Sequence, residues 1–189
     1  MKQPLIIIVA LEAELASHQI PAGIPVIYSG VGKINAAIAT YKAIQTFNPA
    51  MILNFGTVGK INPLLSGLIQ IGKVIQRDMQ TEPLAPRGIV PFCARPNTYS
   101  AATEGYTCGT GDSFVTQYDA WLSDNGVDVV DMELFAIATV AQELGVKWTA
   151  YKFISDDANE ASGTEWSSAV NDGERLFLNQ LQEYLATIQ

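Results

Sequence analysis

The chain has little cysteine and histidine: Cys93, Cys108 and a single histidine, His18, among 189 residues. A structural zinc site usually takes four cysteine or histidine ligands, so this set is too small to build one. A disulfide between the two cysteines would have no framework of other bridges around it. We therefore expect a protein without a metal ion, and not a disulfide-stabilised secreted scaffold.

Long apolar runs are also missing, because no stretch approaches the roughly 18 residues of a membrane-spanning helix. The most apolar N-terminal run, residues 5–11, is short and is closed by Glu12 without a small-residue cleavage site. This pattern predicts a strand and not a signal peptide. No lipidation motif is visible at either end. We expect a cytoplasmic protein with no membrane partner.

Charged residues make up 16% of the chain and hydrophobic residues 48%, which is typical of a compact globular protein. Basic residues number 11 and acidic residues 19, a net charge of −8. A surface of this sign repels a phosphate backbone, so no nucleic-acid partner is expected. The length predicts a single domain, residues 1–189.

Continuous apolar runs alternate with helical spacing along the chain. Residues 5–9, 51–55 and 148–154 read as strands covered on both faces, and residues 33–47, 133–144 and 167–188 as helices. The apolar residues of the first two helices are predicted to face the sheet. In the first helix they are Ile34, Ala37, Ile38, Tyr41 and Ile44. The middle, residues 61–107, reads as a loop-rich insertion with possible short strands at 72–75 and 88–90. The alternation predicts an α/β fold with a mostly parallel sheet.

Polar or glycine-rich clusters follow the predicted strands, at the edge where such sheets bind ligands. They are Ala10-Leu-Glu-Ala-Glu14, Gly30-Val-Gly-Lys33, Asn54-Phe-Gly-Thr-Val-Gly59 and Ser155-Asp-Asp157. None has the spacing of a nucleotide-triphosphate loop, and Gly109-Thr-Gly-Asp-Ser-Phe114 lacks the third glycine of a dinucleotide fingerprint. The alternative for the glycines is a tight strand-to-helix turn that needs a positive φ.

Taken in order, the segments resemble the motifs of the nucleoside phosphorylase/nucleosidase superfamily, in particular its 5′-methylthioadenosine/S-adenosylhomocysteine nucleosidase branch. The first three clusters above carry the resemblance, with Thr110-Gly-Asp-Ser-Phe114, Asp131-Met-Glu133 and Ile154-Ser-Asp156. It spans nearly the whole chain. It implies a three-layer α/β/α fold with a central mixed, mostly parallel twisted sheet, no cofactor and a homodimer.

The resemblance also implies roles for carboxylates in breaking an N-glycosidic bond. Asp156 corresponds to the acid that protonates the leaving purine, with Asp157 as its neighbouring rival. Glu14 corresponds to the residue that activates water, with Glu12 as its competitor. Met132 and Glu133 correspond to the pair that holds the ribose. The alternatives are that Asp156 and Ser155 cap a turn, that Glu14 is a solvated charge, and that Glu133 only starts a helix.

Further substrate-binding residues follow from the same resemblance. Phe114 corresponds to the aromatic that stacks on the base, Val115 to a residue that hydrogen-bonds the purine edge, and Thr57 to a hydroxyl near the sugar. Ser155, next to Asp156, is also expected to bind the substrate. Lys152 stands where the branch has an arginine, which keeps the cation and loses its forked geometry.

The resemblance implies hydrolysis of a purine nucleoside, 5′-methylthioadenosine or a related 5′-modified adenosine, with release of adenine. Phosphorylases of the superfamily carry a Gly-Asp-Pro and arginine segment after the first strand, where this chain has Glu14. Residues 78–106 are shorter than in relatives, which leaves the 5′-group open. The alternatives are a purine nucleoside phosphorylase, a futalosine-type hydrolase, and a non-catalytic nucleoside-binding or storage protein.

Overall fold

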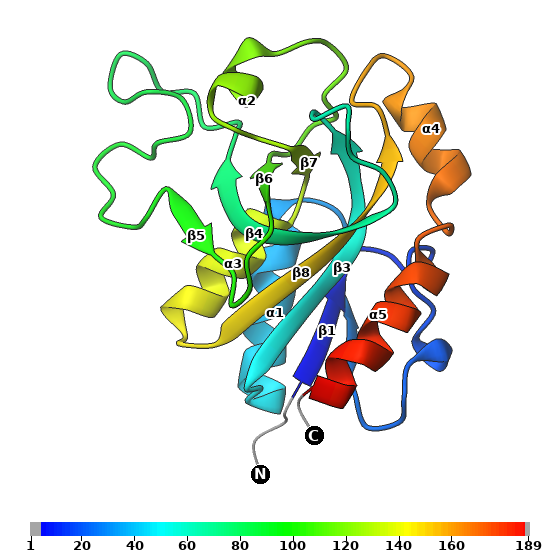
Figure 1. Cartoon of the computed structure of the whole chain (residues 1–189). Coiled ribbons are helices and arrows are strands. Elements are labelled where there is room, and N and C mark those ends of the chain that lie inside the picture. The colour runs from blue at the N-terminus through cyan, green and yellow to red at the C-terminus, as the bar shows by residue number, and fades with distance from the viewer. Residues whose placement is uncertain (1–4, 188–189) are drawn as a thin grey trace.

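The computed structural model describes residues 5–187, and an eight-stranded mixed sheet forms its centre (Figure 1). The strands are β1 Leu5–Val9, β2 Val26–Tyr28, β3 Met51–Lys60, β4 Leu68–Gln76, β5 Thr98–Ser100, β6 Tyr106–Thr110, β7 Val129–Asp131 and β8 Lys147–Asp156. Parallel pairs join β1 to β2 and β3, β3 to β8, and β6 to β4 and β7. Antiparallel pairs join β3 to β7, and β4 to β5 and β8. The expected mixed, mostly parallel sheet is confirmed.

The pairings close part of this sheet into a ring. Starting from β3, the chain of hydrogen-bonded neighbours runs through β7, β6, β4 and β8 and returns to β3. The first half of β3 pairs with β1, and its last two residues pair with β7. The strands β3 and β8 therefore run from the open sheet into the ring, and their ends lie at the same side of the molecule in Figure 1.

Helices cover both faces of the sheet. They are α1 Lys33–Phe47, α2 Ala120–Asp124, α3 Leu134–Glu143, α4 Ser162–Ala169 and α5 Glu174–Thr187, with a 3₁₀ turn at Ser17–Gln19. Alternate residues of β1 face opposite layers, as the pleat of a strand dictates. Ile6 and Ile8 pack in the cluster that contains α3 residues, while Ile7 packs in the cluster of Phe177 from α5. This arrangement confirms the three layers.

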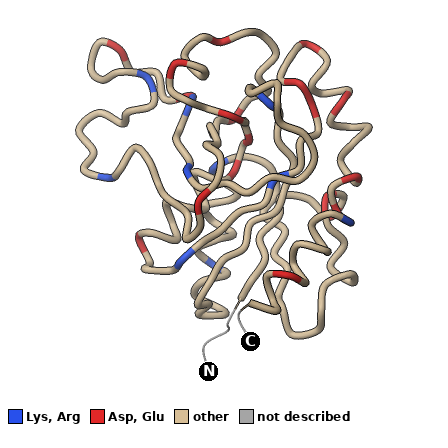
Figure 2. Tube along the Cα trace, in the orientation of Figure 1, with Lys and Arg blue, Asp and Glu red and all other residues tan. Residues whose placement is uncertain are grey.

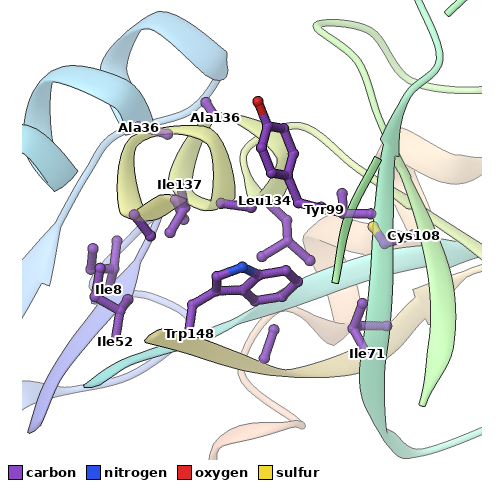
Figure 3. Packing of buried hydrophobic residues seen from close by; sticks show 14 of the residues in the cluster. Ile8, Ala36, Ile52, Ile71, Tyr99, Cys108, Leu134, Ala136, Ile137 and Trp148 are labelled. Atoms are coloured by element: carbon purple, nitrogen blue, oxygen red, sulfur yellow. The ribbon is translucent and has the colours of Figure 1, made fainter. Parts of the chain in front are cut away.

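The cluster beneath α3 contains the largest share of the buried apolar side chains. Figure 3 shows the Trp148 ring of β8 lying under Leu134 and Ile137 of α3. The continuous apolar run of β8 was read from the sequence as a strand covered on both faces. The side chains of Trp148 and Ala150 face this cluster and that of Tyr151 faces the α5 cluster, which confirms the reading.

The helix α1 has the predicted bounds, but most of its predicted apolar stripe faces away from the core. Of its predicted core residues, Ile44 is buried, but Ile34, Ile38 and Tyr41 are exposed, with Ile34 at 74%. The buried side is made mainly of small residues, Ala36 and Ala43 among them, and α1 packs on α3 through contacts between the two helices. Small side chains let two helices approach closely, so the apolar stripe is left facing outward.

Other expectations were wrong in detail. Residues 54–59 are not a loop after a strand but the continuation of β3, and residues 88–90 form no strand. The helix predicted from 167 to 188 is two helices, α4 and α5. A Cβ at Gly173, between them, would lie 2.5 Å from the side chain of Phe153, so the chain turns there at close approach. Ile188, the end of that prediction, lies outside the described residues.

The strands β5, β6 and β7 were not predicted, because each is short and their neighbours in sequence are loops. In the part of the chain that the structure describes, no helix is long and apolar enough to cross a membrane. Cys93 and Cys108 are both free thiols.

Candidate active site

A cavity of about 250 Å³ opens where β3 and β8 end. Its size is close to the lower limit of ligand pockets, roughly 300 Å³, which suits a small molecule. Eight of the nine predicted site residues line it: Glu14, Thr57, Phe114, Val115, Met132, Glu133, Ser155 and Asp156. Figure 2 shows most of the charged positions in the half of the molecule that contains these strand ends. The sequence motifs are therefore brought together in one place.

Glu14 is buried, and both of its carboxylate oxygens accept hydrogen bonds. Oε1 accepts from the backbone N–H of Thr57 at 2.9 Å and from its hydroxyl at 2.8 Å, and Oε2 accepts from Leu11 N–H at 3.1 Å. Its competitor Glu12 is exposed. Donors fixed on β3 and on the loop after β1 thus hold one carboxylate at the cavity wall.

Glu133 is held at the start of α3. Its Oε1 accepts a 2.8 Å hydrogen bond from the N–H of Gly32, whose φ of 93° suits glycine and turns the chain from β2 into α1. The positive-φ reading of the Gly30-Val-Gly32 segment is confirmed, since Gly30 has a φ of 76°. The same turn that shapes the backbone therefore supplies a donor to the predicted ribose-binding carboxylate.

Lys152 does not line the cavity; it is buried behind the wall with 1% of its side chain exposed. Its Nζ donates to Asp131 Oδ2 at 2.8 Å. Asp131 also accepts from the Thr110 hydroxyl and from Leu134 N–H, so its whole carboxylate is satisfied. A Cβ at Gly56 would lie 3.3 Å from this Nζ and 3.5 Å from Glu14 Oε1, so a glycine on β3 leaves room for both charged groups.

The carboxylates in this region perturb one another. Burial and the charge of Asp131 raise the pKa of Glu133 to about 7, with Glu14 adding to the repulsion; Lys152 and the Gly32 N–H oppose the rise. Burial alone would also raise the pKa of Asp131. The charge and hydrogen bond of Lys152, with the Thr110 and Leu134 donors, hold that pKa below its ordinary value.

Asp156 projects into the cavity from the end of β8, where the pairing with β3 slips. Val58 pairs with Ile154, but Gly59 pairs with Asp156, so Ser155 is an extra residue in the strand. Such a bulge re-aims side chains and explains why two consecutive residues line one cavity. Asp156 accepts from the Ser155 hydroxyl at 2.9 Å and from Ala158 N–H at 3.0 Å.

The choice between the two adjacent aspartates is decided by their surroundings. Asp157 is 56% exposed and forms an ion pair with Lys60 at 2.8 Å, outside the cavity lining. Asp156 is buried and inside it. A Cβ at Gly59 would lie 2.6 Å from Asp156 Oδ1, so this glycine is required for the carboxylate to reach its place.

Part of the cavity wall is a loop, residues 111–117, that carries Phe114 and Val115. Phe114 is 49% exposed, and Val115 packs in a small cluster with Val130 and Ala158. Arg77, buried after β4, supports this loop by donating to the carbonyl oxygens of Gly109, Gly111 and Ser113. A second cavity of about 480 Å³ adjoins the first across Arg77 and residues 113–115.

Three residues of the site were not singled out from the sequence. Trp166 of α4 lines the cavity and donates from Nε1 to the Thr57 hydroxyl oxygen at 2.9 Å. Arg77, which supports the loop of residues 111–117, belongs to none of the motifs that carry the resemblance. Asp131 belongs to the motif Asp131-Met-Glu133, but no role is predicted for it from the sequence. A charge balance would have signalled Asp131, because a buried Lys152 requires a nearby carboxylate.

Comparison with known proteins places this geometry in a family. The sequence profile described as Phosphorylase superfamily matches residues 22–188. The chain belongs to this superfamily. A curated superfamily relative, the 5′-methylthioadenosine/S-adenosylhomocysteine nucleosidase of Shewanella sp. (strain W3-18-1), is 28% identical over 166 residues, which are 75% of this chain and 71% of the relative.

Solved structures share the fold of this superfamily member. The native futalosine hydrolase of Helicobacter pylori strain 26695 superposes with a TM-score of 0.87 at 20% identity and covers 98% of each chain. The 5′-methylthioadenosine/S-adenosylhomocysteine nucleosidase of Helicobacter pylori, solved with butyl-thio-DADMe-Immucillin-A, has a TM-score of 0.87 at 21% identity and covers 99% of each chain. The predicted superfamily and fold class are confirmed.

Proposed function

We propose that the chain hydrolyses the N-glycosidic bond of a purine nucleoside, 5′-methylthioadenosine or a related 5′-modified adenosine, and releases adenine. The observation that carries this proposal is that Glu14 and Asp156 project into one cavity that also holds Glu133. The names of the curated relatives agree with this reaction. The activity is assigned to one domain of residues 1–189.

The proposed mechanism divides three tasks among these carboxyl groups. Asp156 donates a proton to the purine as the bond between the base and the anomeric carbon breaks. Glu133 accepts hydrogen bonds from the ribose hydroxyls, since a carboxylate held by one N–H retains lone pairs for them. Glu14 orients a water, whose oxygen bonds to the anomeric carbon while its proton passes to the carboxylate. The negative charge of Glu14 also stabilises the oxocarbenium-like transition state.

The remaining site residues bind the substrate in this proposal. Phe114 stacks on the base, and the Val115 backbone meets the purine edge, both from the loop of residues 111–117. Thr57, Met132 and Ser155 border the sugar and the acid. Lys152 acts from behind the wall, because its charge offsets those of Asp131 and Glu133. No cofactor and no metal enters this scheme.

Hydrolysis fits this cavity better than phosphorolysis. A phosphate near Glu14 and Glu133 would meet two carboxylates, and the Arg77 guanidinium is engaged by backbone carbonyl oxygens. A futalosine-type hydrolase is the second candidate, favoured by the TM-score of 0.87 to such an enzyme. A non-catalytic nucleoside binder would have no use for Asp156 held at the cavity wall.

We also propose that the protein is a cytoplasmic homodimer. The exposed apolar side chains of α1, Ile34, Ile38 and Tyr41, support an association between copies, and Val31 joins them to the cavity because it lines that cavity. Two free cysteines suit a reducing compartment. Light scattering across a concentration series tests the dimer.

The decisive experiment follows adenine release from 5′-methylthioadenosine by chromatography, with and without phosphate. Release that does not depend on phosphate supports the proposal, and the same assay with futalosine-type nucleosides then ranks the 5′-groups. Release only with phosphate would contradict the role given to Glu14. A nucleoside-induced rise in melting temperature without any base release over hours would favour the non-catalytic binder.

A further inference from the structure

Trp166 connects two parts of the site that are far apart in sequence. It lies on α4, which begins six residues after Asp156, and its indole Nε1 is 2.9 Å from the hydroxyl oxygen of Thr57 on β3. The ring is half-buried and lines the cavity. A buried indole N–H usually has a hydrogen-bond partner, and here that partner is a hydroxyl that itself contacts Glu14.

The direction of each hydrogen bond in this chain is fixed by chemistry. An indole N–H can only donate, so the Thr57 oxygen must accept from Trp166. The hydroxyl then has one proton left to give, and Glu14 Oε1 lies 2.8 Å away. An ionised carboxylate can only accept, so the order runs from Trp166 through Thr57 to Glu14 with no alternative arrangement.

This order orients the Thr57 hydroxyl. Without the indole N–H, the hydroxyl could rotate and accept from water or donate toward the cavity. Hydrogen bonds in series also polarise one another, so the Trp166 donor strengthens the bond from Thr57 to Glu14. The other donors to Glu14, from the backbone of Thr57 and Leu11, remain in either case.

We propose that Trp166 is a positioning residue for the hydrolysis: its indole N–H orients the Thr57 hydroxyl, and that hydroxyl holds Glu14 where it activates water. This inference rests on the proposed function for the role of Glu14. Trp166 acts through Thr57 and does not itself touch the reacting atoms.

The kinetic test compares Trp166→Phe with the wild type. Phenylalanine keeps a ring at the wall and removes the N–H, so we expect kcat to fall about three- to tenfold, the value of one hydrogen bond, with KM within about twofold. Trp121→Phe is the matched control, because Trp121 packs under Arg87 outside the first cavity, and it should leave kcat unchanged. An equal loss in the control, or a change confined to KM, would overturn the proposal.

Variants of Thr57 show whether the effect of Trp166→Phe on kcat passes through the Thr57 hydroxyl. In a Thr57→Val background the hydroxyl is gone, so Trp166→Phe should cause no further loss of kcat. In a Thr57→Ser background, which restores a hydroxyl, the loss should return. If Trp166→Phe lowers kcat by the same factor in the Thr57→Val background as in the wild type, the two residues act independently. Trp166 would then only form part of the cavity wall.

A measurement without turnover separates this inference from the proposed function. The Trp166 indole N–H resonance is assigned by its disappearance from the NMR spectrum of the Trp166→Phe protein. Thr57→Val and Glu14→Gln should each shift this resonance and leave those of Trp121 and Trp148 in place. If the resonance shifts but the wild-type protein releases no adenine, the hydrogen-bond chain is supported and the proposed function is contradicted. If the resonance does not move, the hydrogen-bond chain itself is contradicted.

Discussion

The two sides of the cavity are built differently. The strand side consists of Thr57 on β3, Glu14 on the turn after β1 and Glu133 directly before α3, and each carboxylate there is buried and accepts from a backbone N–H. The loop side carries Phe114, which is half exposed, on a segment supported from behind by Arg77. The carboxylates assigned to the reaction are thus fixed by backbone N–H donors, whereas the side chain assigned to the face of the base lies half exposed on a loop.

Asp156→Asn tests the strand side most directly, because Asp156 ends β8 and its carboxylate accepts from the Ser155 hydroxyl and from Ala158 N–H. An amide cannot donate the proton that the purine needs, so we expect adenine release to fall about 10²- to 10⁴-fold with adenine still bound. Asp157→Asn is the control and should retain activity, since Asp157 pairs with Lys60 outside the cavity. Equal losses in both variants would mean that the acid is misassigned.

Lys152→Met tests whether the strand side depends on its buried cation. The substitution leaves Asp131 and Glu133 without the charge that offsets them, so we expect the free energy of unfolding to fall by about 3–5 kcal/mol at neutral pH. Urea denaturation measures this loss. Adding Asp131→Asn should restore part of the lost stability, because it removes the buried negative charge that Lys152→Met leaves unpaired. If no stability is restored, Lys152 stabilises the fold by packing alone.

Glu133→Gln separates charge from shape on the strand side. Because burial and Asp131 raise the pKa of Glu133 from 4.5 to about 7, the folded protein binds this proton more tightly than the unfolded chain. That contribution to stability is complete below pH 4.5 and is lost as the pH rises through 7.

The wild type should therefore lose up to about 3 kcal/mol relative to Glu133→Gln between pH 4.5 and pH 8. Parallel unfolding curves of the two proteins across this range measure the difference. A constant difference at all pH values would show that Glu133 does not titrate in this window.

Phe114→Leu should have the smallest effect, because it alters the loop side only. Loss of stacking is worth about 0.5–1.5 kcal/mol, so we expect adenine to bind about two- to tenfold more weakly, with little change in the unfolding free energy. Calorimetric titration measures the affinity. Phe92→Leu, at a position that is 94% exposed, is the control. An equal loss of adenine affinity in Phe92→Leu, or no loss in Phe114→Leu, would contradict the role given to Phe114.

Much of the fold and most of the site could be predicted from local pattern. The bounds of α1 and the place of β1 follow from apolar spacing, and the motifs converge on the cavity because parallel strands end at one edge. The exposure of Ile34, Ile38 and Tyr41 on α1 could not be predicted, since an apolar stripe is the same whether it faces a core or a partner surface. The predicted loop at residues 54–59 is a strand because β7 and β8, distant in sequence, pair with it.

The residues that were missed share a physical reason. Trp166 contacts Thr57, which is 109 positions away in sequence. It lies on a helix with few apolar residues, so no local pattern predicts this contact. Arg77 gives its donors to backbone carbonyl oxygens, which leave no mark on the sequence of the loop that it supports. Side chains that act through other residues are found only when the fold brings them together.

Closing five strands into a ring also decides how this chain can meet other proteins. Within residues 5–187 the sheet ends at β2 and β5, and each of these is three residues long. Short edges offer few unpaired N–H and C=O groups, so they are poor templates for edge-to-edge strand addition and for the aggregation that begins with it. A partner must therefore be recognised by side chains on the helices and loops.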